Sequence, residues 1–266
     1  MKSKTLLLFG CVVLGACGSQ PQQHDPALDA GLLWVKHSAE YPAITKQVYA
    51  SATQALPRFI DDESWSAVPG QVDAKDLPVA VILDVDETSV SNVDFQLTYE
   101  RPFANWKLDE WTSGTAATPI AGMKEFVDAA SAAGVTVFFV TNRPCEVIEG
   151  VDDPCPQKQS TIDDIAEAGV DTDADHVMLS GEQGWNREKS VRRNLIAKTH
   201  RVIMLIGDDL VDFVPCTRRK AYAPCTQSAT VEYRHAMVDK YAHRWGNGWY
   251  ILPNPMHGSW TSVVPH

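Results

Sequence analysis

The chain has 266 residues, is 44% hydrophobic and carries a formal net charge of −11. A chain of this length and composition can bury a full core in one domain, and its acidic surface would repel a polyphosphate backbone, which argues against a nucleic-acid polymer as partner. The sequence has no internal repeat, low-complexity tract or heptad pattern, which excludes solenoid and coiled-coil architectures.

The N-terminus predicts export. Lys2 and Lys4 precede an apolar stretch, residues 5–15, that is too short to span a bilayer and is typical of a signal-peptide core. Residues 14–17, Leu-Gly-Ala-Cys, look like a lipobox, in which Cys17 is lipidated and becomes the first residue of the mature protein. An ordinary cleaved signal is the alternative.

These features divide the chain into three parts. We expect a lipoprotein signal peptide over residues 1–16, a lipid-anchored tether over residues 17–27 and a single domain over residues 28–266. The protein would then be an exported bacterial lipoprotein of the cell envelope, bound to a membrane through the lipid on Cys17. Gly18 is compatible with sorting to the outer membrane, with the domain in the periplasm or at the surface.

Helical patterns open the domain. Residues 28–41 and 43–56 predict two helices, separated at Pro42 because proline breaks a helix interior. Residues 61–76 predict a loop, and the unbroken apolar run that follows, residues 79–83, predicts a buried strand. Open α/β sheets bind ligands at the C-terminal ends of such strands, so the next residues are candidates for a site.

Asp84 and Asp86 stand directly after this strand. Two buried like charges are costly unless a cation or a shared proton compensates them, so the pair predicts a metal site. It also predicts two chemical roles, one aspartate as nucleophile and the other as general acid and base. The alternative for this pattern alone is a strand that ends in a solvated acidic turn.

Residues 95–118 follow the first strand and are predicted to form a cap over the strand ends. The cap contains Phe103, Trp106 and Trp111, whose rings either stack on a nucleobase or pack the cap onto the core. Pro119 can begin a helix, and the amphipathic pattern after it supports one.

Two more apolar runs end in polar residues. Residues 135–140 precede Thr141 and Asn142. Residues 202–206 precede a cluster of three aspartates, Asp208, Asp209 and Asp212.

Helical patterns at residues 161–168 and 187–197 and a short strand at 176–179 lie between these two runs. Strands that alternate with helices predict an α/β fold, here a Rossmann-like parallel sheet with helices on both faces. The polar residues at the strand ends would then meet along one edge of the sheet.

Four cysteines lie within the domain, Cys145, Cys155, Cys216 and Cys225. In an oxidising compartment they predict two disulfides, for which three connectivities exist. Local pairing, Cys145 with Cys155 and Cys216 with Cys225, needs the least rearrangement and is our expectation. The rival is a four-cysteine zinc site, which the missing CxxC spacing disfavours.

The strand ends together resemble a known superfamily. Asp84 to Thr88, Thr141 with Asn142, Lys189 and the 208–212 segment occur in the order of the four motifs of the haloacid dehalogenase-like phosphohydrolases. Further segments are similar to the class C bacterial acid phosphatases, which are lipoprotein 5′-nucleotidases and phosphomonoesterases; they are residues 34–49, Asn92, 140–143, 161–164, 207–213 and 252–260. The resemblance implies a haloacid dehalogenase-like core with a small cap and N-terminal helices.

An aspartyl-phosphate mechanism is implied by this resemblance. Asp84 would attack phosphorus, and Asp86 would protonate the leaving alkoxide and then activate water. Mg²⁺ would be held by the Asp84 carboxylate, the Asp86 backbone carbonyl and Asp208, because Mg²⁺ prefers oxygen ligands. Thr141, Asn142 and Lys189 would bind the transferring phosphoryl group. A solvated helix lysine is the alternative for Lys189.

Four further residues have supporting roles in this interpretation. Asp212 and Asp209 would support the metal site, with a helix N-terminal cap as the alternative for each. Thr88 would orient the loop that carries the first motif. His257 stands where the family often has a tyrosine, and it would alter the preference for nucleotides if that position contacts the substrate's base.

The sequence therefore predicts a secreted, lipid-anchored, Mg²⁺-dependent acid phosphatase. Its partner would be a small phosphorylated metabolite, with nucleoside 5′-monophosphates as the expected substrates. Because Asp86 must be protonated for the first step, activity should favour mildly acidic pH. A broad phosphatase for non-nucleotide esters and a non-catalytic surface lipoprotein on the same fold are the alternatives, and monomeric and dimeric states both stay open.

Overall fold

The computed structural model describes residues 26–99, 103–114 and 117–264. The expected signal peptide, the lipidation site Cys17 and the tether up to residue 25 lie outside the described residues. Among the residues that are described, no helix is long and apolar enough to cross a bilayer.

Five parallel strands form the central sheet, in the order β5-β4-β1-β6-β7. They are β1 (Val79–Leu83), β4 (Thr136–Pro144), β5 (Val177–Ser180), β6 (Arg201–Gly207) and β7 (Trp249–Ile251). The predicted α/β fold with a parallel sheet is confirmed, and so are the four strands that the apolar runs predicted. Because β1 lies between β4 and β6, the residues after Leu83 meet the ends of both neighbours.

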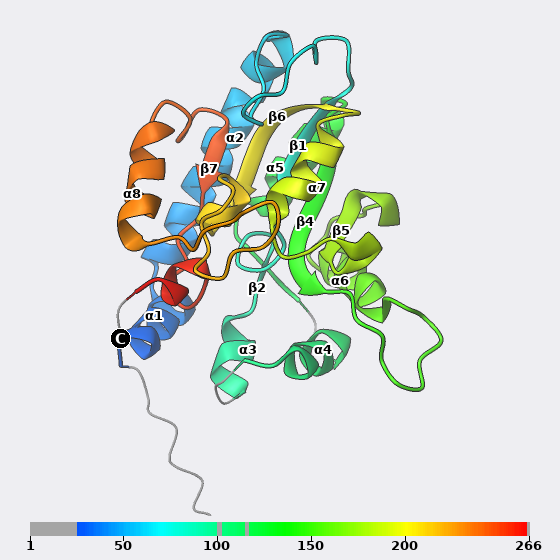
Figure 1. Ribbon diagram of the computed structural model, residues 1–266, viewed down its shortest axis with the longest axis vertical. Coiled ribbons are helices and arrows are strands. Elements are labelled where there is room, and N and C mark those ends of the chain that lie inside the picture. The colour runs from blue at the N-terminus through cyan, green and yellow to red at the C-terminus, as the bar shows by residue number, and fades with distance from the viewer. Residues whose placement is uncertain (1–25, 100–102, 115–116, 265–266) are drawn as a thin grey trace, which may run out of the picture.

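Both faces of this sheet are buried. Along β1, Val81 and Leu83 pack into one apolar cluster, whereas Ala80 and Ile82 pack into another, because successive side chains of a strand point to opposite faces. The helices concerned are α2 (Glu40–Asp61), α5 (Met123–Ala132) and α7 (Lys189–Ile196). Helices α2 and α5 cover the first face, and α7 covers the second (Figure 1). Two-sided burial explains why the strands read as continuous apolar runs.

Several short elements lie beyond the C-terminal ends of the strands. They are α1 (Pro26–His37), α3 (Val93–Thr98), α4 (Asn105–Gly114) and an antiparallel pair, β2 (Val90–Ser91) with β3 (Thr118–Pro119). Figure 1 shows α3 and α4 below the sheet, where the cap was expected. An ion pair joins α1 to α3, with 2.6 Å between Lys36 Nζ and Asp94 Oδ1.

Two further helices complete the described domain, α6 (Pro156–Glu167) and α8 (Val231–Lys240). Helix α6 begins at Pro156, five positions before the predicted start at Thr161, because proline is well suited to a first helical turn. Neither α8 nor the three-residue strand β7 was predicted. A strand this short gives no period that can be read.

The predicted helix break at Pro42 is wrong. The chain breaks instead at Ser38 and Ala39, and Pro42 lies in the first turn of α2. The first four N–H groups of a helix have no partner within it, so a proline there removes no helical hydrogen bond. The Ser38 hydroxyl takes one of these groups, accepting from the Tyr41 N–H at 3.1 Å.

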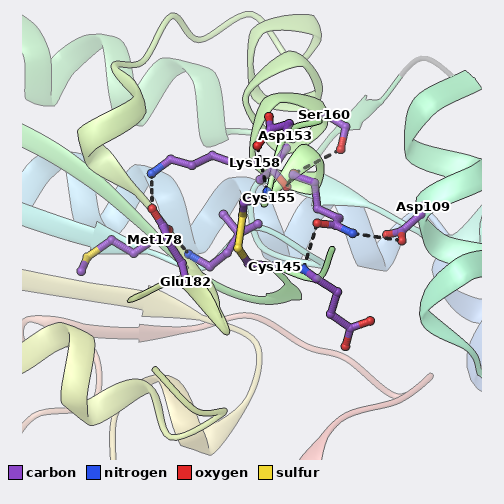
Figure 2. The surroundings of a disulfide bond; sticks show 12 residues. Asp109, Cys145, Asp153, Cys155, Lys158, Ser160, Met178 and Glu182 are labelled. Carbon is purple, nitrogen blue, oxygen red and sulfur yellow. Dashed lines mark hydrogen bonds and ion pairs between the residues drawn. A yellow bond between two sulfur atoms is a disulfide. The ribbon is translucent and has the colours of Figure 1, made fainter. Parts of the chain in front are cut away.

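The two predicted disulfides form, and they exclude the four-cysteine zinc site. Cys145 pairs with Cys155 and Cys216 with Cys225, with Cα–Cα distances of 4.8 and 5.3 Å. Figure 2 shows the first pair, where the Cys155 N–H donates to Asp153 at 2.8 Å. This loop lies against the cap, because Glu146 accepts a hydrogen bond from the Asn105 amide of α4 at 2.9 Å.

Candidate active site

A cavity of about 560 Å³ opens at the C-terminal ends of β1, β4 and β6. The predicted site residues that line it are Asp84, Asp86, Asn142, Lys189, Asp208, Asp209, Phe103 and His257. Thr88, Thr141 and Asp212 lie behind the lining and bond to Asp208, Asp86 and Lys189 respectively. The parallel sheet thus brings the four sequence motifs to one place, as their positions at strand ends predicted.

Asp84 and Lys189 form an ion pair at the base of this cavity. Lys189 Nζ lies 2.5 Å from Asp84 Oδ1 and 2.6 Å from Asp212 Oδ1, so one ammonium group bridges two carboxylates. Burial raises the pKa of Asp84 to about 7, against the opposing effect of the Lys189 charge. Burial acts to lower the pKa of Lys189, but Asp212 and Asp84 outweigh it and hold that pKa above its usual value, which keeps the ammonium charged. The solvated-lysine alternative is wrong, since Lys189 is 3% exposed.

Arg143 and Asn92 hold the carboxylate of Asp86. Both Nε and Nη2 of Arg143 lie 2.9 Å from Asp86 Oδ1, and the Asn92 amide donates to the same oxygen at 2.7 Å. Burial acts to raise the pKa of Asp86, but the Arg143 guanidinium and the Asn92 amide outweigh burial and hold it below its ordinary value. Arg143 is itself fixed by a second ion pair, to Asp164 of α6.

Asp208 is the carboxylate of the site that has no cationic partner among the described residues. It accepts hydrogen bonds from Asn254 at 2.7 Å and from the Thr88 hydroxyl at 3.3 Å. Burial, with the nearby charges of Asp212 and Asp209, raises the pKa of Asp208 to about 7. An added cation would relieve this excess of negative charge.

The donor atoms fit a hard metal ion. Carboxylate oxygens of Asp84, Asp208 and Asp212 all lie within 4.8 Å of one another, and oxygen ligands of this kind suit Mg²⁺. Lys189 shares its single positive charge between Asp84 and Asp212, whereas Asp208 has no cationic partner among the described residues. An ion held by Asp84 and Asp208 therefore agrees with the charges of the site and with two of the three predicted ligands.

Asp209 and Asp212 also cap a single turn of 3₁₀ helix at residues 210–212. The Asp209 carboxylate accepts from the Val211 N–H, and the Asp212 carboxylate accepts from the Asp209 N–H at 3.0 Å. Asp209 is further bonded to the backbone and hydroxyl of Ser259. The capping alternative is thus the role that the structure shows for Asp209, whereas Asp212 caps this turn and also anchors Lys189.

Asn142 lines the cavity and has an amide donor without a partner among the described residues. Its Oδ1 accepts a hydrogen bond from Arg192 at 2.8 Å, whereas its Nδ2 is buried and has no partner among the described residues. An anion in the cavity would satisfy that donor. The Thr141 hydroxyl is less available, because it accepts from the Arg143 N–H at 3.0 Å within the loop.

The sequence of residues 16–260 matches the model of a family described as HAD superfamily, subfamily IIIB (acid phosphatase). The chain belongs to this family of acid phosphatases. The resemblance drawn from the four motifs is therefore confirmed.

Solved structures agree with this assignment. The class C acid phosphatase from Bacillus anthracis is similar at a TM-score of 0.67 and 24% identity, over 88% of this chain and 86% of that chain. A structure of the same B. anthracis enzyme with tungstate bound is similar at a TM-score of 0.68 and 23% identity, over the same shares. At these identities the likeness concerns the fold.

The opposite wall of the cavity in this acid phosphatase comes from the cap. Phe103 lines the cavity, together with Phe95 and Leu108, which were not predicted. Trp111 packs edge-on against Phe95, with ring centroids 6.1 Å apart, and does not line the cavity. Trp106 is 62% exposed and does not line it either. Of the three predicted rings, Phe103 alone is therefore placed to touch a ligand.

His257 lines the cavity of the acid phosphatase as part of an ion pair. Its Nε2 lies 2.8 Å from Glu87 Oε2, and Glu87 is fully buried. Burial acts to lower the pKa of His257, but Glu87 raises it to about 9, so the imidazole is cationic at neutral pH. Pro144, the last residue of β4, lines the cavity, whereas no residue of the disulfide loop 145–155 does.

Sequence reasoning missed Arg192, which holds the loop of Thr141 and Asn142 in the acid phosphatase. It is fully buried and donates to the Thr141 and Met178 carbonyls as well as to Asn142. Arginine is rarely buried without such partners, and nothing in the helical spacing separates it from the neighbouring Arg193. Only the packing of α7 against β4 in the folded structure distinguishes Arg192 from its neighbour.

Asn92→Ala is expected to move the alkaline limb of the kcat/KM profile upward by about half to one pH unit. The Asn92 amide stabilises ionised Asp86, so its removal raises the pKa of that carboxyl and keeps the acid form present to higher pH. Steady-state kinetics between pH 4 and 9 measure the shift. Asn105→Ala is the control, because Asn105 makes a comparable bond to Glu146 at 2.9 Å outside the cavity. Equal shifts in both variants, or a downward shift, would contradict the assignment.

Proposed function

We propose that the protein is an Mg²⁺-dependent phosphomonoesterase that works through an aspartyl-phosphate on Asp84. The observation that carries the proposal is the pairing of Asp84 with Lys189, beside an Asp86 held by Arg143, in one cavity. A binding protein has no need of a nucleophile and a separate acid in contact with the same ligand. The non-catalytic alternative is disfavoured for that reason.

Two in-line displacements account for the reaction. An oxygen of Asp84 attacks phosphorus while the bond to the leaving alkoxide breaks, and Asp86 gives that alkoxide a proton. Asp86 then takes a proton from water, the water oxygen attacks the same phosphorus, and Asp84 leaves as a free carboxylate. Bound Mg²⁺, held by Asp84 and Asp208, would offset the charge of the phosphate against that of Asp84.

A lysine and an amide group would position the phosphoryl group. Lys189 and the free amide of Asn142 face the cavity and would bind its oxygens. The depressed pKa of Asp86, which burial opposes and Arg143 enforces, means that the free enzyme holds little of the acid form at neutral pH. Turnover should therefore favour mildly acidic pH, as the sequence predicts.

Nucleoside 5′-monophosphates remain the substrates that the cap favours. Phe95 and Phe103 line the cavity opposite the carboxylates, and aromatic rings in that position can stack on a base. One observation favours a broader phosphatase for other small esters. His257 stands where the family often has a tyrosine, and it forms an ion pair with Glu87.

Export and lipidation belong to the same proposal. Their support is the lipobox-like sequence ending at Cys17 and the presence of two disulfides, which persist in oxidising compartments. The enzyme would act in the cell envelope as a lipoprotein, where phosphate esters from outside the cell are its substrates.

Phosphate release from a panel of nucleoside monophosphates and p-nitrophenyl phosphate tests the function. The soluble chain from Gln20 would be assayed with Mg²⁺ and with EDTA. We expect turnover that EDTA removes and Mg²⁺ restores, since the carboxylate cluster needs a cation to accept a phosphate dianion. A folded, metal-loaded protein that releases phosphate from none of these esters would support the non-catalytic alternative instead.

A further inference from the structure

Two arginines that line the cavity are not used by the proposed chemistry. Lys189, Arg143 and His257 all have carboxylate partners. Arg187 and Arg218 line the same cavity, and neither guanidinium has a hydrogen bond or salt bridge to any of the described residues.

Arg218 is the more enclosed of these two arginines. Its Nε is buried without a partner. The charge of Arg218 acts on the carboxylate of Asp209, which already accepts from Ser259 and lies 3.5 Å from Arg234. A buried guanidinium N–H that lacks an acceptor is destabilising, and an anionic ligand would remove that penalty.

Hydrogen bonds tie the segment that carries Arg187 to the loop that carries Arg218. Glu188, next to Arg187, is 2% exposed and accepts a hydrogen bond from the Cys216 N–H at 3.1 Å. The Asn186 amide donates to the Ala223 carbonyl at 2.9 Å. Residues 186–188 are thereby tied at two points to the loop that the Cys216–Cys225 disulfide closes.

The carbonyl of Arg218 is held in addition by the Ala229 N–H at 2.9 Å, so this loop is anchored on both sides of the arginine. A loop fixed in this way holds a charged side chain in place before a ligand arrives, which lowers the entropy lost on binding. Arginine is also the side chain best matched to planar or tetrahedral oxyanions, since its fork of N–H groups binds two oxygens at once.

We propose that Arg187 and Arg218 form a second anion subsite, and that the preferred substrates are small phosphomonoesters that carry a second anionic group, either a phosphate or a carboxylate. The inference rests on the proposed phosphatase function and revises its substrate preference, because it ranks such esters above the nucleoside 5′-monophosphates that the cap favours. The scissile phosphate would lie at Asp84 and Lys189, and the second anion would lie at the arginines on the same side of the cavity. The ester's carbon skeleton would then face the apolar cap.

Binding to the inactive variant Asp84→Asn tests this subsite without turnover. Titration calorimetry on the mature chain with Mg²⁺ would compare two matched pairs of probes, 3-phosphoglycerate with glycerol 3-phosphate, and adenosine 3′,5′-bisphosphate with AMP. We expect the member with the second anion to bind about 10-fold more tightly or better, as a charge-assisted bidentate contact allows. The first pair tests a carboxylate and the second pair tests a phosphate.

Arg187→Gln and Arg218→Gln, made singly and together in the Asp84→Asn chain, should reduce that ratio toward one. Arg219→Gln is the matched control, because Arg219 is exposed, lies next to Arg218 and does not line the cavity. Equal affinities within both pairs, or a ratio that survives the double arginine variant, would overturn the subsite. If the wild-type chain releases no phosphate but the affinity ratio is intact, the catalytic proposal is overturned and the subsite stands.

Discussion

Asp84→Asn is expected to abolish phosphate release, with kcat reduced by about 10⁴-fold or more, the scale of loss seen when a covalent nucleophile is removed. An amide is a poor nucleophile, and the change also removes one of the two carboxylates that share Lys189. The effect should therefore fall on kcat, while the fold persists. The measurement is kcat on p-nitrophenyl phosphate at saturating Mg²⁺, with circular dichroism to confirm folding.

Asp128→Asn is the matched control for this experiment. Asp128 also loses an ion pair, to Lys124 at 2.6 Å, but it lies on the exposed face of α5. Exposed pairs of this kind contribute about 0–1 kcal/mol to the free energy of unfolding, so the control should keep its activity. An Asp84→Asn chain that retains more than a few per cent of wild-type kcat would exclude Asp84 as the nucleophile.

Lys189→Met is expected to reduce both activity and stability. Without the ammonium, Asp84 and Asp212 face each other as buried carboxylates, and breaking a buried pair in this way typically lowers the free energy of unfolding by about 3–5 kcal/mol. Activity should fall by about 10²–10³-fold, because a preorganised positive charge at the phosphoryl group is lost. Chemical denaturation and steady-state kinetics measure the two effects separately.

The stability loss in Lys189→Met should depend on pH in a defined direction. Burial already raises the pKa of Asp84 to about 7 and of Asp212 to about 6, and losing the lysine charge raises both further. A carboxyl whose folded pKa lies above its unfolded value destabilises the fold at high pH, and that effect disappears as pH falls below the unfolded value. The deficit should therefore be larger at pH 8 than at pH 5. The control is Lys158→Met, because Lys158 pairs with a single carboxylate, Glu182, at 2.6 Å and does not line the cavity. A deficit that is the same at both pH values, or one equal to that of the control, would contradict the bridging role.

The local patterns of the sequence were sufficient to predict four of the five strands of the sheet and the acidic residues at their ends. Residues 79–83 and 202–206 are buried on both faces, so each run is apolar throughout and easy to recognise. Parallel pairing of these strands then requires Asp84 and Asp208 to approach each other. The strands and the acidic residues at their ends can both be read from short stretches of consecutive residues.

The partners of these acids could not be predicted in the same way. Arg192 reaches Asn142 from α7, and a buried arginine has the same sequence appearance as an exposed one. The break before α2 depended on the Ser38 cap and not on Pro42. The cap rings Trp106 and Trp111 differ from Phe103 in their tertiary packing, which aromatic composition does not reveal.

The central place of β1 also sets the time at which the enzyme becomes active during synthesis. The ribosome delivers Asp84 early, but its neighbour β6 and the residues Asn254 and Ser259, which hold Asp208 and Asp209, are translated much later. Until then, Asp84 follows a strand that has no neighbour on its β6 side. The two carboxylates that would share a cation therefore meet only when nearly the whole polypeptide is available, so an unfinished or truncated chain has no competent centre.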